Sequence, residues 1–174
     1  EEEVKELVES QAAFADYYSG YGWFGQLSTM DPFNGYQIFM ENQDDFVYNE
    51  NGDAFAREYA DEDVDYSIWS LNIHDYEYNG SVTFKIMMNN QDIVSDSYYL
   101  GVFDGQECVG KVQPIVFPLT NEYVFPLMAY NNSEYAELTM KLYDVSQNEV
   151  IDIPKKLSFR NDMIIGNAME PIVI

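Results

Sequence analysis

Short runs of β-forming residues, separated by turn-forming pairs, dominate the chain after residue 65. The runs are rich in Val, Ile, Phe, Tyr and Thr and cover residues 66–72, 81–88, 98–103, 108–117, 121–130, 136–143, 150–153 and 156–159. The turn pairs between them are Asn79-Gly80, Asn89-Asn90, Asp104-Gly105, Asn131-Asn132 and Gln147-Asn148. Strands that recur about every 8–12 residues with turns between them predict a β-sandwich and argue against βαβ units.

Proline positions refine this prediction. Pro lacks a backbone donor, so Pro114, Pro118, Pro126 and Pro154 indicate edge strands or bulges. The apolar residues 171–174 (PIVI) are predicted to form the last strand of the sandwich. In a polymer they would instead pair with an edge strand of the next subunit.

The first third of the chain has a different pattern. Residues 1–15 have a helix-compatible composition without a clean apolar stripe, whereas residues 14–25 (FADYYSGYGWFG) favour short strands and tight turns. We therefore predict an all-β protein: a small aromatic-rich β-subdomain over 1–48, with one short helix at its start, an acidic linker or loop over 49–65, and an Ig-like or jelly-roll β-sandwich over 66–174.

Charge excludes one class of partner. The chain has 8 Lys and Arg against 31 Asp and Glu, a formal net charge of −23, and −15 of that charge falls in residues 1–66. Nucleic acids and anionic membrane surfaces repel such a protein. No apolar run reaches the roughly 18 residues of a membrane span. Because Glu1, Glu2 and Glu3 do not start a secretory signal, we expect an intracellular chain or a processed fragment of a larger one.

Catalytic candidates are few. His74 is the only histidine, and we predict a surface or strand-edge residue that hydrogen-bonds its neighbours. Cys108 is the only cysteine, so it forms no internal disulfide or thiolate cluster, and we predict a small buried side chain. Carboxylate pairs arise from composition alone in so acidic a chain. The sequence therefore predicts no enzyme.

One acidic run has the spacing of a calcium loop. Asp61, Asp63 and Asp65 alternate as oxygen ligands of a hard cation do, but the sixth and twelfth positions are Tyr66 and Asn72, which rules out an EF-hand. A looser calcium site that includes Asn51 or Asp53 and a solvated acidic linker both remain open. Thermal unfolding with millimolar calcium and with EDTA separates them, because a cation that binds only the folded state raises its stability.

The aromatic cluster also has two interpretations. Its rings could stack against the apolar faces of sugar rings, with Tyr18, Tyr21 and Trp23 as the contacts, or they could form the core of the small subdomain. The cluster comprises Tyr17, Tyr18, Tyr21, Trp23, Phe24 and Tyr36. Sugar binding predicts a planar row of exposed rings. A purely structural role predicts that Trp23 and Trp69 are buried.

Two segments carry scaffold patterns. The first comprises residues 8–17 (VESQAAFADY), Gly22-Trp23-Phe24-Gly25, Leu27, Met30, Pro32 and Gly35-Tyr36. The second comprises Trp69, Asn72, residues 74–78 (HDYEY), Val82-Thr83, Gly101-Val102-Phe103, Glu107-Cys108, Gly110 and Leu142-Tyr143-Asp144. Together they resemble β modules that recur in large secreted or cell-surface proteins of Bacteroidota and related bacteria, often exported by the type IX system. The sequence departs from the pattern at Phe33-Asn34 and at Lys111.

This resemblance implies export and a repeat-like structural role, and it carries over no catalytic residue. We therefore expect a non-catalytic extracellular module that acts as a spacer, adhesin segment or filament subunit, with neighbouring modules or subunits of the same protein as partners. The alternative is a carbohydrate-binding module, attached to a polysaccharide-degrading enzyme, whose partner is a polysaccharide.

Overall fold

The computed structural model describes residues 6–31, 34–40 and 68–174. The chain divides into two compact units, Glu1–Asp65 and Tyr66–Ile174, which are described separately. Apart from one 3-10 helix (η1, Ile73–Asp75), every regular element in the described residues is a β-strand, so the predicted all-β class is confirmed. Within the same ranges no helix is long and apolar enough to cross a membrane.

The first unit contains an antiparallel sheet in the order β3-β2-β1-β4. Its strands are β1 (Leu7–Glu9), β2 (Phe14–Tyr18), β3 (Gly22–Gly25) and β4 (Gln37–Phe39). The Ser10 hydroxyl accepts hydrogen bonds from the Ala12 and Ala13 amides, which closes the turn between β1 and β2. A helix at the start is wrong for residues 6–15, because residues 7–9 pair with β2 and β4 as a strand.

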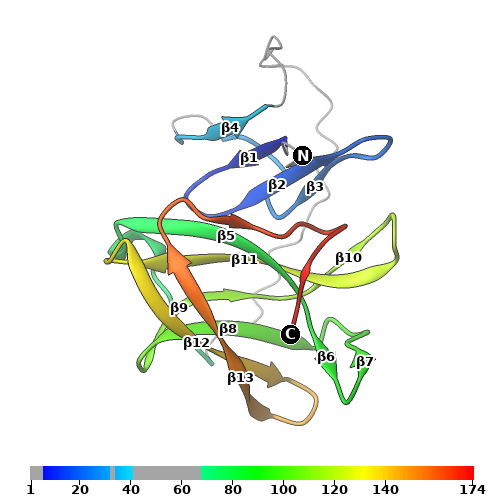
Figure 1. Cartoon of the computed structure of the whole chain (residues 1–174), viewed down its shortest axis with the longest axis vertical. Helices are drawn as coiled ribbons and strands as arrows, with labels where there is room; N and C mark the ends of the chain where they lie inside the picture. The colour runs from blue at the N-terminus through cyan, green and yellow to red at the C-terminus, as the bar shows by residue number, and fades with distance from the viewer. Residues whose placement is uncertain (1–5, 32–33, 41–67) are drawn as a thin grey trace. The chain divides into compact units, whose positions relative to one another are not determined.

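The second unit is a sandwich of two sheets (Figure 1). One sheet has the order β10-β11-β5-β14, with β15 also paired to β5, and the other has the order β13-β12-β8-β9. A small hairpin, β6-β7, follows β5. The strands are β5 (Tyr78–Lys85), β6 (Met87–Met88), β7 (Gln91–Asp92), β8 (Tyr98–Asp104), β9 (Glu107–Val112), β10 (Ile115–Phe117), β11 (Glu122–Asn131), β12 (Tyr135–Asp144), β13 (Glu149–Arg160), β14 (Ile164–Ile165) and β15 (Ile172–Val173).

The strand order is that of an Ig-like sandwich. Strands β5, β11 and β10 take the places of B, E and D, while β8, β12 and β13 take those of C, F and G. Pro114 lies between β9 and β10, where the chain leaves one sheet for the other. The place of strand A is filled by β14 and β15 from the C-terminal segment, and both run parallel to β5. The prediction that residues 171–174 supply the last strand is confirmed.

The core lies between these two sheets. Leu100 and Val102 alternate with Gly101 and Phe103 along β8, so period-2 spacing directs one set inward. The same alternation on the other strands completes one hydrophobic cluster, whose most deeply buried members include Val82, Val109, Phe125, Leu127, Ala129, Leu138 and Leu142.

Most of the predicted turns are confirmed. Asn89 and Asn90 both have positive φ (53° and 61°) in the turn that joins β6 and β7. Gly105, with φ of 59°, begins the tight turn between β8 and β9. Asn79-Gly80 as a turn is wrong, because both residues lie inside β5. A Cβ atom on Gly80 would lie 2.6 Å from the Cγ atom of Met163, so close packing explains this glycine.

Several strand predictions need correction. The run 108–117 is two strands, β9 and β10, in different sheets, and the run 81–88 contains the end of β5 and the separate strand β6. Residues 68–72 form no strand and lead instead into η1. The runs 150–153 and 156–159 are one strand, β13, which lies at the edge of its sheet. Its register with β12 shifts between Leu138 and Met140, and Pro154 lies opposite this irregularity. This is where a residue without a backbone donor is tolerated, as predicted.

Candidate functional site

The aromatic residues of the first unit divide between the two faces of its sheet. Tyr18 is buried, with 8% of its surface exposed, whereas Trp23 is 49% exposed. Tyr21 lies in the turn before β3 and is partly exposed. Tyr18 therefore packs in the core, as a structural role predicted, but the prediction that Trp23 is buried is wrong.

Trp23 forms a pair with Tyr17, which belongs to the predicted aromatic cluster but not to the three residues chosen as sugar contacts. Tyr17 on β2 lies directly opposite Trp23 on β3, so both side chains project from the same face. Their ring centroids are 5.4 Å apart with an interplanar angle of 67°, and Tyr17 is 44% exposed. Strand alternation was the available signal, because Tyr17 and Tyr18 must point to opposite faces.

This pair offers a patch for an apolar ligand face, although its rings do not lie in one plane. An edge-to-face arrangement lets a sugar stack on one ring while the other ring contacts its rim. The planar row of rings that sugar binding predicted is therefore not present in Tyr17 and Trp23. The patch as built is small and centres on one half-exposed tryptophan.

The calcium candidates Asp61, Asp63 and Asp65 lie outside the described residues, as do Asn51 and Asp53. Within residues 6–31, 34–40 and 68–174, no group of three or more His, Cys, Asp or Glu side chains is arranged to hold a metal ion. The calcium site in the acidic run stays a prediction.

The two residues considered for catalysis have different environments. His74 is exposed on η1, where the Asn72 side chain accepts a hydrogen bond from the His74 amide. Cys108 is buried, and its thiol donates to the Gly110 carbonyl at 3.4 Å. Burial raises the pKa of the Cys108 thiol, which disfavours the reactive thiolate.

Trp69 fixes the segment before β5 to the sandwich of the second unit. Its ring meets Phe103 edge-on at 5.1 Å between centroids and lies 6.3 Å from the ring of Tyr143. Gly101 makes room for it, because a Cβ atom there would lie 2.6 Å from the Cζ3 atom of Trp69. Lys111 donates a 2.7 Å hydrogen bond to the Trp69 carbonyl. Trp69 is half-buried, not fully buried as a purely structural role predicted, and it fixes this segment to the outer face of β8.

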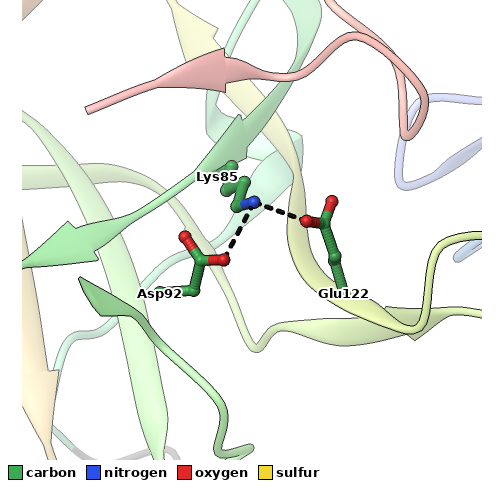
Figure 2. Close-up of polar contacts among 3 residues, drawn as sticks. All are labelled: Lys85, Asp92 and Glu122. Atoms are coloured by element: carbon green, nitrogen blue, oxygen red, sulfur yellow. Dashed lines mark hydrogen bonds and ion pairs between the residues drawn. The ribbon is translucent and has the colours of Figure 1, made fainter. Parts of the chain in front are cut away.

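An ion-pair cluster joins three strands of the second unit (Figure 2). Lys85 on β5 lies 2.7 Å from a Glu122 carboxylate oxygen on β11 and 3.0 Å from Asp92 on β7. The Lys85 side chain is only 16% exposed. The hydrogen bond to Glu122 raises the pKa of Lys85, and Asp92 adds to the effect, although desolvation opposes it. The Lys85 carbonyl also accepts a 3.0 Å hydrogen bond from the Ile174 amide, next to β15.

Replacing this lysine tests the cluster. We expect Lys85→Met to lower the free energy of unfolding at neutral pH by about 0.5–1 kcal/mol, since both carboxylates are partly exposed. The folded-state pKa lies above the ordinary 10.5, so the stabilisation is present below that pH and disappears as pH rises through the folded-state pKa. Urea unfolding at pH 7 and at steps above 10.5 measures this.

Lys156→Met is the matched control. It removes the same charge from an exposed lysine on β13 that has no carboxylate partner among the described residues. Equal losses for the two variants at pH 7 would show that net charge, and not the cluster, sets the effect.

Comparisons with known proteins found no relative that bears on the site. No family model, no curated protein and no solved structure matches the chain.

Proposed function

We propose that the chain is a non-catalytic structural module of a secreted or cell-surface protein. The observation that carries the proposal is the fixing of both ends of the sandwich. Trp69 holds the incoming segment on β8, and the last residues pair with β5 through β14 and β15. A module whose ends are both fixed to its core holds its neighbours at a defined spacing.

Two further properties support this role. A net charge of −23 keeps crowded surface proteins soluble and apart. The scaffold pattern around Trp69, Gly101 and Gly110 resembles that of secreted β modules, and both glycines occupy positions where a side chain would collide. Spacer, adhesin segment and filament subunit are the forms of this role, with neighbouring modules or subunits as partners.

Surface labelling tests the proposal. An antibody against the second unit is expected to stain intact cells that produce the protein, and external protease is expected to remove the signal. A periplasmic or cytoplasmic protein in the same cells serves as the control. Staining that requires permeabilised cells would contradict an exported module.

Carbohydrate binding is the second candidate, and the exposure of Trp23 favours it. A half-exposed tryptophan beside an exposed tyrosine leaves ring surface open to solvent, on which a sugar could stack. In this case the chain would be the binding module of a polysaccharide-degrading enzyme.

Tryptophan fluorescence tests this candidate directly. In a Trp69→Phe background Trp23 is the only emitter, so its spectrum is expected to shift to the blue when neutral oligosaccharides bind. Tyr17→Ala is expected to weaken the response several-fold, because it removes the adjoining ring. A spectrum that stays unchanged at millimolar oligosaccharide would rule out sugar binding at this face.

A further inference from the structure

The C-terminal segment, residues 163–174, is attached to the sandwich differently from the other strands. Its two strands, β14 and β15, both run parallel to β5, whereas every other strand pair in the described residues is antiparallel. Residues 166–171 separate the two strands, and the Asn167 side chain closes this stretch by accepting hydrogen bonds from the Met169 and Glu170 amides. The strand pairing of the segment is therefore confined to one edge, that of β5.

The same segment completes the core. Ile165 lies opposite Val82 and Ile172 lies opposite Phe84, and both isoleucines pack against the buried cluster between the two sheets. Met163 belongs to that cluster and is 2% exposed. Without the segment, β5 would have an open backbone edge beside an uncovered apolar core. The segment and the edge of β5 are complementary, and their contacts are the same whichever copy of the chain supplies the segment.

One tight turn connects the segment to β13. The Met163 amide donates to the Arg160 carbonyl at 3.1 Å, which closes a β-turn with Asn161 and Asp162 at its centre. Asp162 has φ of 56°, in the left-handed region that residues with a side chain adopt at a cost. Across this turn the chain leaves the sheet of β13 and enters the sheet of β5. A short strained turn before a terminal element favours exchange of that element between copies, because opening the turn releases the strain.

From this arrangement we propose that residues 163–174 exchange between copies of the chain, so that β14 and β15 of one copy pair with β5 of a second copy. The exchanged form keeps the pairing along β5 and the packing of Ile165 and Ile172, and it loses the turn hydrogen bond from Met163 to Arg160. The exchange supplies the contact for the filament-subunit form of the proposed function and rests on that form. It is measured on purified protein, so its failure leaves the surface-labelling result unaffected, and the reverse also holds.

Two substitutions at Asp162 test the turn. Glycine adopts positive φ without strain and favours the closed turn, whereas β-branched valine resists it and favours the open one. Asp162→Gly and Asp162→Val remove the same charge and the same 3.0 Å hydrogen bond from the Asn161 side chain, so they are a matched pair. We expect the association constant of the valine variant to exceed that of the glycine variant by at least about tenfold. Size-exclusion chromatography with light scattering at millimolar protein measures it.

Asn148→Val is the control for strain alone. Asn148 also has positive φ, 50°, but its turn joins β12 and β13, which pair with each other. We expect this variant to lose stability and to associate no more than the unmodified chain. Association as strong as that of Asp162→Val would show that destabilised chains associate without exchange, and it would contradict the proposal.

Disulfide trapping identifies the strand that is exchanged. Lys85 and Val173 are paired residues of β5 and β15, and Val173 is 52% exposed. Lys85→Cys in one preparation and Val173→Cys in a second, mass-tagged one can form a mixed disulfide at this pair only between copies. Met169→Cys, an exposed position outside the ladder, replaces Val173→Cys as the control. Cys108 is buried and stays in place, with the unmodified chain as its control.

We expect the mixed disulfide with Val173→Cys to form several-fold more than the one with Met169→Cys. Equal yields would overturn the exchange, as would equal association constants for Asp162→Gly and Asp162→Val. The trapping experiment keeps the native turn, so it decides the question even where Asp162→Val fails to fold. Thermal unfolding of each variant shows whether it is folded.

Discussion

Replacing Trp69 with alanine is expected to lower the free energy of unfolding of the second unit by about 2–4 kcal/mol. The ring packs on Phe103 and Tyr143, and its loss leaves the space over Gly101 empty. The figure lies below that of a fully enclosed tryptophan because Trp69 is half-buried. Urea unfolding followed by circular dichroism measures the change.

A double-mutant cycle makes this prediction specific. Gly101→Ala alone places its Cβ atom against the Trp69 ring, so it should destabilise the protein by about 1–3 kcal/mol. In the Trp69→Ala background only the Phe103 ring, 2.9 Å from the added Cβ atom, still obstructs it, so the same substitution should cost less. Losses that add to within about 0.5 kcal/mol would show that the ring does not occupy the space over Gly101 in solution.

The second large effect is expected at Gly110 on β9. A Cβ atom there would lie 2.5 Å from the Met128 carbonyl oxygen on β11 and 2.7 Å from Val102 Cγ2. Backbone cannot move away as a flexible side chain does, so Gly110→Ala should separate β9 from β11. We expect a loss of about 2–3 kcal/mol in unfolding free energy, measured in the same urea experiment.

Gly105→Asn provides the comparison for Gly110. Gly105 has φ of 59° in the turn before β9, and nothing lies within 4 Å of an added Cβ atom. Asparagine adopts this backbone conformation more readily than other residues, so the loss should stay below about 1 kcal/mol. If Gly110→Ala proved as mild as this turn substitution, the close approach of β9 to β11 would be wrong.

The sequence predicted those parts of the fold that depend on local signals. Most strands from β8 to β12 follow from period-2 alternation and from turn pairs such as Asp104-Gly105. Within this stretch β8 pairs with β9 and β10 pairs with β11, whereas the chain changes sheet between β9 and β10 and between β11 and β12. Asn79-Gly80 has the same local signature, yet Gly80 is needed because the Met163 side chain packs against it. Met163 is more than 80 residues away in the sequence. The local sequence cannot distinguish a glycine that forms a turn from a glycine that leaves room for a side chain from a distant part of the chain.

The candidate sites were less predictable for a related reason. Composition identified Trp23, but the face on which it lies depends on the pairing of β2 with β3. The register of β13 on β12 shifts partway along the pair, and the sequence gives no signal for the size of that shift except Pro154. Tyr135 and Arg160 are 25 residues apart and become neighbours only through that register.

The parallel pairing of β14 and β15 with β5 also sets the order in which the sandwich can be completed. Residues 81–85 are synthesised more than 80 residues before the partners that cover them, Ile164–Ile165 and Ile172–Val173. During synthesis the edge of β5 therefore has open backbone groups, and contacts so distant in sequence form slowly. In the order of synthesis, this sheet therefore stays incomplete until residues 164–173 have emerged.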